Sequence, residues 1–199
     1  MGGNSSPLLA DLFLAHCEFQ YMSSLLKEKK FNLAKLLSNT TRYIDDLCFF
    51  NYKYFHSIKD KIYPLDLAAD RNGNDDKAVS YLDVKLVVQE DGCHTSVYHK
   101  VEDFDFHVIL LTFPSSLIPL KMGGRIYAGQ ILRYLRICSN FKDFVDRAIA
   151  ITQLLKSRGY SSSDLQFCME KVISKHSFIL SKFNLFSARQ VSNSLGFSC

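Results

Sequence analysis

The sequence predicts an α+β fold, and three observations support that prediction. Apolar residues at helical spacing follow a Ser-Ser-Pro start near the beginning of the chain. Short apolar runs beside acidic or glycine-containing turns predict β-hairpins at residues 41–50 and 78–98. Helical spacing then dominates beyond residue 100. We therefore expect helix, hairpin, helix and hairpin over residues 1–100, followed by a helical bundle.

The first predicted helix begins at the Ser5-Ser6-Pro7 stretch and ends at about Lys27. Ser5 and Ser6 offer an N-cap, and Pro7 suits the first helical turn because an N–H there would have no helical partner. The apolar residues that share helical spacing are Leu8, Leu12, Ala15, Phe19, Met22 and Leu26.

Two adjacent aspartates interrupt an apolar run after the first helix. Tyr43 and Ile44 precede Asp45 and Asp46, and four apolar residues follow, which predicts a hairpin with two carboxylates at its tip. Strand alternation would place Tyr43 and Asp45 on one face. Neighbouring negative charges repel unless a cation neutralises them, which a divalent metal ion does well. We assign Asp45 as a metal ligand and Asp46 as its weaker or indirect partner; a surface turn with two hydrated acids is the alternative.

Three further elements are expected before residue 100. Residues 52–62 place apolar side chains on one helical face and stop before Pro64. Alternation at residues 65–69 predicts a short strand. Residues 78–88 and 95–98 are predicted to pair as strands around a turn at residues 90–92.

The second half carries a candidate nucleic-acid surface on predicted helices at residues 125–139, 141–158 and 163–179. Arg133 and Arg136 lie three residues apart with Tyr134 beside them, and Lys142 and Arg147 are nearby. Basic residues interleaved with aromatic residues suit a nucleic-acid backbone and its bases. Hydrated surface arginines are the alternative, because exposed arginines on a helix are usually only hydrated. The Ser- and Asn-rich residues 181–199 are expected to form a poorly ordered tail.

Composition narrows the class of protein. The chain has 199 residues, a net charge of +4 and 47% hydrophobic residues, which fits a globular protein and permits a nucleic-acid partner. Six scattered cysteines favour a reduced intracellular setting, nuclear or cytoplasmic, with no disulfide partner. No apolar run has the length of a membrane span, so no membrane association is expected. Cys93, His94 and His99 fit no standard zinc spacing.

Two segments together resemble the palm of reverse transcriptases, the RNA-directed DNA polymerases. Gly2-Gly3-Asn4-Ser5-Ser6-Pro7 leads into the first helix, and Tyr43-Ile44-Asp45-Asp46 follows about 37 residues later. Downstream, residues 80–85 and 127–140 are similar to retroelement (retrotransposon) polymerases of the Penelope-like kind. The resemblance covers roughly residues 1–180.

The resemblance implies a partial polymerase palm over residues 1–100, a helical thumb over 101–180 and an unmatched tail over 181–199. Asp45 and Asp46 would then hold Mg²⁺ or Mn²⁺ for template-directed DNA synthesis by two-metal nucleotidyl transfer. The partners implied are dNTPs and an RNA or DNA template-primer, with Arg133, Arg136 and Lys142 on the nucleic acid. The residues matching the nucleotide- and template-binding segments are Gly2, Gly3, Ser5, Ser6 and Tyr43.

One departure from the family pattern predicts that this chain is inactive alone. In the family a further catalytic aspartate comes from a strand before the Gly-Gly loop, whereas no Asp or Glu precedes Asp11 here. We therefore expect a reverse-transcriptase fragment that binds nucleic acid weakly and does not polymerise. The alternatives are a non-catalytic nucleic-acid-binding retroelement remnant and a reading frame with no function.

Overall fold

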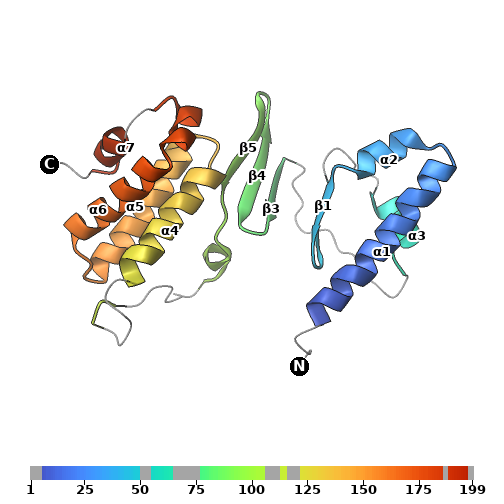
Figure 1. Ribbon diagram of the computed structural model, residues 1–199, viewed down its shortest axis with the longest axis horizontal. Helices are drawn as coiled ribbons and strands as arrows, with labels where there is room; N and C mark the ends of the chain where they lie inside the picture. Colours follow the sequence, from blue (N-terminus) through green and yellow to red (C-terminus); the bar gives the residue numbers. More distant parts are fainter. Residues whose placement is uncertain are drawn as a thin grey trace. The chain divides into compact units, whose positions relative to one another are not determined.

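The computed structural model describes residues 6–49, 55–64, 77–105, 113–115, 122–185 and 188–196, and its fold is α+β with small antiparallel sheets (Figure 1). The chain divides into a first unit, Met1–Asn74, and a second unit, Asp75–Cys199. This boundary differs from the one predicted at residue 100. The strands predicted at residues 78–98 belong with the C-terminal helices.

The first unit contains the predicted helix and the predicted aspartate hairpin. Its elements are α1 (Ser6–Lys27), α2 (Phe31–Leu37), β1 (Thr40–Tyr43), β2 (Asp46–Phe49), η1 (Phe55–Ser57) and α3 (Lys59–Ile62). The helix expected at residues 52–62 is instead the two short turns η1 and α3, and residues 50–54 lie outside the described residues. The strand expected at residues 65–69 also lies outside them.

The first unit has a small core between α1 and the elements that follow it. Its buried residues are Leu25, Ala34, Leu37, Phe55, Ile58 and Tyr63. From α1, Leu14, Cys17 and Tyr21 also pack against this core. The opposite side of α1 carries residues that share the predicted helical spacing, and it is exposed: Phe19 is 71% exposed and Leu8 61%.

The second unit begins with a three-stranded antiparallel sheet, β3 (Ala78–Tyr81), β4 (Val84–Gln89) and β5 (Gly92–Val97), in the order β3-β4-β5. The sequence predicted one continuous strand over residues 78–88. The structure divides it because Leu82 and Asp83 form a two-residue turn, in which Leu82 has a φ of 54°. A leucine in this left-handed conformation is uncommon, so nothing in the sequence pattern signalled the turn.

The remaining elements are η2 (Lys100–Asp103), α4 (Met122–Ile137), α5 (Phe141–Ser157), α6 (Ser162–Lys175), η3 (Ser177–Phe183) and α7 (Ala188–Ser194). Figure 1 shows α4, α5 and α6 side by side, in agreement with the three predicted helices. They enclose one core, whose largest members are Tyr127, Phe144, Ile131, Leu135, Leu155, Leu165, Met169 and Ile173. The sheet joins this core through Val97.

Strand β5 is also tied to the end of α4 by hydrogen bonds. The Thr95 hydroxyl donates to the Ile137 carbonyl. The Thr95 N–H donates to the Ser139 hydroxyl over 3.0 Å, and the Ser139 N–H donates to the Thr95 carbonyl over 2.8 Å. The Ile137 carbonyl is the last in α4 and has no helical partner, so the bond from Thr95 satisfies it.

The chain beyond residue 181 differs from the predicted poorly ordered tail. Helix η3 continues to Phe183, and α7 places Val191 in the core with no exposed surface. The Ser192 hydroxyl donates to the Glu170 carboxylate over 3.0 Å. The packing of α7 on the core depends on isolated apolar residues, so no periodic pattern in the sequence predicted it.

Two further findings concern membranes and disulfides. Within the described residues, no helix combines the length and apolar character needed to cross a membrane. The described cysteines Cys17, Cys48, Cys93, Cys138 and Cys168 are free thiols.

Packing at the start of α4 yields a matched pair of glycine substitutions. A methyl group at Gly123 would overlap the ring of Tyr160, whereas one at Gly129 would meet nothing within 4 Å. We expect Gly123→Ala to destabilise the second unit by about 1–3 kcal/mol, despite the better helix propensity of alanine. Gly129→Ala should stabilise it by about 0.5–1 kcal/mol. Urea unfolding of both variants measures this, and equal shifts would contradict the packing.

Candidate functional site

The two predicted metal ligands lie at the tip of the β1–β2 hairpin. Tyr43 pairs with Asp46 across the strands, so Ile44 and Asp45 form the two-residue turn, with Ile44 at a φ of 55°. Directly paired residues project from the same face of a hairpin. Tyr43 therefore shares its face with Asp46, and the expectation that it shares a face with Asp45 was wrong because the turn interrupts strand alternation.

The carboxylates of Asp45 and Asp46 are exposed, and neither forms an ion pair or hydrogen bond with another described residue. Adjacent carboxylates offer the oxygen ligands that Mg²⁺ prefers. Across the described ranges, however, no three Asp, Glu, His or Cys side chains are grouped closely enough to hold a metal ion. The residues present therefore fit part of a Mg²⁺ coordination sphere, and the rest would have to come from water or other ligands.

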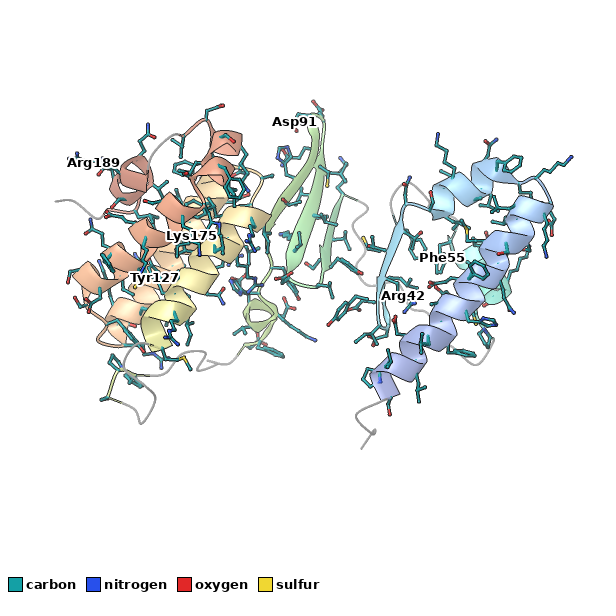
Figure 2. The ribbon with its side chains drawn as sticks, viewed as in Figure 1. Arg42, Phe55, Asp91, Tyr127, Lys175 and Arg189 are labelled. Carbon is teal, nitrogen blue, oxygen red and sulfur yellow. The ribbon has the colours of Figure 1, made fainter. Side chains whose placement is uncertain are left out.

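Arg42 attaches this hairpin to α1 (Figure 2). Its Nε lies 2.7 Å from Glu18 Oε1, and its Nη1 lies 2.5 Å from Asp11 Oδ1. The same Nη1 donates to the Ile44 carbonyl in the hairpin turn over 3.1 Å, and Nη2 donates to the Asp11 carbonyl over 3.2 Å. The Arg42 side chain is only 10% exposed. One guanidinium thus fixes both the strand and the turn that carries Asp45.

Glu18 joins a third element to this contact. The Tyr63 hydroxyl, directly after α3, donates to Glu18 Oε1 over 2.6 Å. Burial and this hydrogen bond raise the pKa of Tyr63 above its ordinary value. Burial alone would lower the pKa of Arg42, but its bonds to Glu18 and Asp11 raise it. Both groups therefore keep the protonation state that binds Glu18.

Sequence reasoning did not find the Arg42 contact. Asp11 and Glu18 lie seven residues apart, which places them on the same side of a helix. That spacing was the available signal, but only the fold identifies Arg42 as the cation between them. The contact also brings the hairpin turn to the first half of α1, about 8 Å along the helix axis from Ser6.

The other residues of the predicted nucleotide site are only partly described. Gly2, Gly3 and Ser5 lie outside the described residues. Ser6 is the first residue of α1 and is exposed, and Tyr43 is 57% exposed at the end of β1.

The three predicted nucleic-acid residues have different surroundings. Arg133 on α4 is 28% exposed, and its Nε lies 2.8 Å from Asp83 Oδ2 in the β3–β4 turn. Arg136 and Lys142 are exposed near the α4–α5 connection and form no side-chain ion pair within the described residues. The structure therefore leaves two of the three side chains available to a phosphate backbone.

A second group of charges lies next to Arg133, and it includes Arg147, which the sequence placed among the candidate nucleic-acid residues. The Arg147 guanidinium on α5 binds both carboxylate oxygens of Glu102 in η2. His99 Nε2 lies 3.4 Å from the Tyr134 hydroxyl, and the two rings meet edge to face. Burial lowers the pKa of His99, and the nearby Arg147 and Arg133 lower it further.

Arg42 provides a test of the hairpin attachment. Arg42→Met keeps much of the apolar stem but leaves the Glu18 carboxylate without its cation, so we expect the first unit to lose about 1–3 kcal/mol. Amide hydrogen exchange in β1 and β2 should accelerate. Lys35→Met, on the exposed side of α2, is the control and should change neither quantity. Unaltered exchange in Arg42→Met would contradict the attachment.

His99 provides a test by pH. Its folded pKa is below the ordinary value of 6.5, so the unfolded chain binds the extra proton first. Stability of the second unit should therefore fall as the pH drops from about 7.5 to about 5.5, and His99→Gln should remove that part of the fall. Glu102 does not interfere, because Arg147 holds its pKa below 4.5. Urea unfolding at several pH values measures the effect, and an identical pH dependence in His99→Gln would contradict it.

Comparisons with known proteins add no family to this description. No family model matches the chain, and no curated protein or solved structure matches it.

Proposed function

We propose that this chain is part of a retroelement reverse transcriptase, with the β1–β2 hairpin as its metal-binding element. The proposal rests on one observation. The Tyr43-Ile44-Asp45-Asp46 tip is a tight hairpin turn held against α1 by Arg42, with two carboxylates left exposed. A nucleotidyl-transfer site needs carboxylates presented in this way, fixed by the backbone and open to a metal ion.

Each residue of the hairpin has a distinct role in this proposal. Asp45 and Asp46 would hold Mg²⁺ or Mn²⁺. Such an ion, when bound, activates the primer 3′-hydroxyl and stabilises charge on the leaving pyrophosphate. Arg42 keeps the turn in place and neutralises Asp11 and Glu18, so that these acids add little repulsion near the tip. Tyr43 lies on the same face as Asp46, where it could contact a nucleotide or template base.

The small number of grouped carboxylates supports a second part of the proposal, that this chain alone does not polymerise. Two-metal catalysis requires a carboxylate that bridges both ions. The described residues near the hairpin tip offer Asp45 and Asp46 without a third grouped ligand. A metal ion should therefore bind weakly, with water completing its coordination.

Nucleic-acid binding is assigned to the helical bundle. Exposed Arg136 and Lys142 would contact phosphates of an RNA or DNA template-primer, in an intracellular setting, nuclear or cytoplasmic. With so few phosphate contacts, the affinity should fall in the weak range of non-specific binding, a Kd of about 10⁻⁴–10⁻⁶ M.

A non-catalytic nucleic-acid-binding role is the second candidate. It is favoured by the contrast between two available cations at the α4–α5 connection and an incomplete ligand group at the hairpin tip. In that case Arg133→Ala/Arg136→Ala would abolish nucleic-acid binding and Asp45→Asn would change nothing measurable.

Manganese binding at the hairpin tip is the direct test. We expect Mn²⁺ to broaden the amide NMR signals of residues 43–47 first, because paramagnetic broadening falls off steeply with distance from the ion. Asp45→Asn should remove most of this effect, since one of two adjacent carboxylates is lost. Asp60→Asn, an exposed acid on α3 in the same unit, is the matched control and should leave the broadening intact.

Primer extension completes the experiment. The chain is incubated with labelled template-primer, dNTPs and Mg²⁺ or Mn²⁺, and we expect binding without extension. Extension that disappears in Asp45→Asn would contradict the inactivity of the chain alone. The proposed function would be overturned if Mn²⁺ broadened the signals equally in the wild-type chain, Asp45→Asn and Asp46→Asn, and if no template-primer binding were detected.

A further inference from the structure

Two ion pairs join the β3–β4–β5 sheet and η2 to two different helices of the second unit. Asp83 in the β3–β4 turn pairs with Arg133 on α4, and Glu102 in η2 pairs with Arg147 on α5. These ion pairs are additional to the hydrogen bonds that join Thr95 to the end of α4.

The Asp83 contact is fixed from both sides. The Tyr98 N–H donates to the Asp83 carbonyl over 2.9 Å, which holds the turn backbone to the chain following β5. On the helix side, Arg133 Nη1 lies 3.4 Å from Gln130 Oε1, one helical turn earlier. Only 28% of the Arg133 side chain is exposed, and its buried Nε faces Asp83 as an ion pair without an aligned hydrogen bond.

The Glu102 contact is bidentate, with both oxygens of the carboxylate on the two terminal nitrogens of Arg147. This geometry defines orientation as well as distance. His99 and Tyr134 meet with ring centroids 5.9 Å apart, close enough to both ion pairs for all four charges to act on His99. Arg133 and Arg147 thus hold segments in the neighbourhood of one aromatic contact.

We infer that Arg133 and Arg147 are positioning residues, forming a two-point clamp that fixes the β3–β4 turn and η2 on the helical bundle. Arg133 is then not a phosphate ligand. The clamp keeps the β3–β4 turn in a fixed position relative to Arg136 and Lys142. The turn and these two side chains can then contact the same nucleic acid. This last consequence rests on the proposed function, whereas the clamp itself rests on the ion pairs.

The alternative role of Arg133, contact with phosphate, makes the opposite prediction for Asp83. If Arg133 binds phosphate, Asp83 competes with the nucleic acid, and Asp83→Asn should tighten binding. If Arg133 is a positioning residue, Asp83→Asn releases the turn and should weaken binding roughly three- to tenfold. The sign of the change separates the two roles.

The salt dependence of binding gives a second, independent separation. Each phosphate contact contributes about 0.7–0.9 to the slope of log K against log salt concentration. Arg133→Gln should weaken template-primer binding by the full chain with that slope unchanged. Arg136→Gln, on the same helix and exposed, is the matched control and should lower the slope by about that amount. The charge-swapped pair Asp83→Arg/Arg133→Asp should recover affinity lost in the single variants.

Hydrogen exchange tests the clamp even if no nucleic acid binds. Asp83→Asn and Arg133→Gln should each accelerate amide exchange around residues 81–84, and Arg136→Gln should not. Tighter binding in Asp83→Asn, a lower slope in Arg133→Gln, or unchanged exchange in both would overturn the clamp. If the wild-type chain does not bind template-primer but exchange responds as expected, the nucleic-acid-binding part of the proposed function fails and the clamp stands.

Discussion

A two-stranded hairpin is marginally stable by itself, and a small sheet becomes stable by packing an apolar face or packing against a helix, a constraint that governs both units of the chain. In each unit an arginine reaches from one element to a carboxylate on another and fixes the small sheet to helices. Arg42 does so for the β1–β2 hairpin, and Arg133 does so for the β3–β4 turn. Apolar burial stabilises each unit, through residues such as Leu25 in the first and Val97 in the second, while the arginines set the geometry.

Prediction from the sequence succeeded where a pattern was local and repeated. Helical spacing located α1, α4, α5 and α6, and the apolar-acidic-apolar run located the β1–β2 hairpin. It failed where one residue decided the outcome. The left-handed Leu82 adds a strand to the second sheet, and Val191 draws α7 into the core; neither is announced by periodicity. The division at residue 74 reflects packing between distant segments, which composition does not encode.

The candidate site shows the same division between local and distant information. The adjacent pair Asp45-Asp46 is visible in the sequence, and its position at a hairpin tip followed from the flanking residues. Its attachment to α1 was not predictable, because Arg42 and Asp11 lie 31 residues apart and only the folded chain brings them together. Arg133 illustrates the reverse case. Its spacing with Arg136 suggested two equivalent cations, whereas the fold gives Arg133 a carboxylate partner and leaves Arg136 exposed.

The exposed side of α1 has a consequence for solution work. Leu8, Leu12, Phe19 and Leu26 repeat along this side of the helix, and each is more than half exposed. A continuous apolar stripe of this kind favours contact between chains as concentration rises. Association through the stripe would bring several chains together, and a template-primer long enough to contact two of them would then bind with avidity. For such a ligand, the apparent affinity of concentrated or surface-immobilised protein would exceed that of the dilute chain.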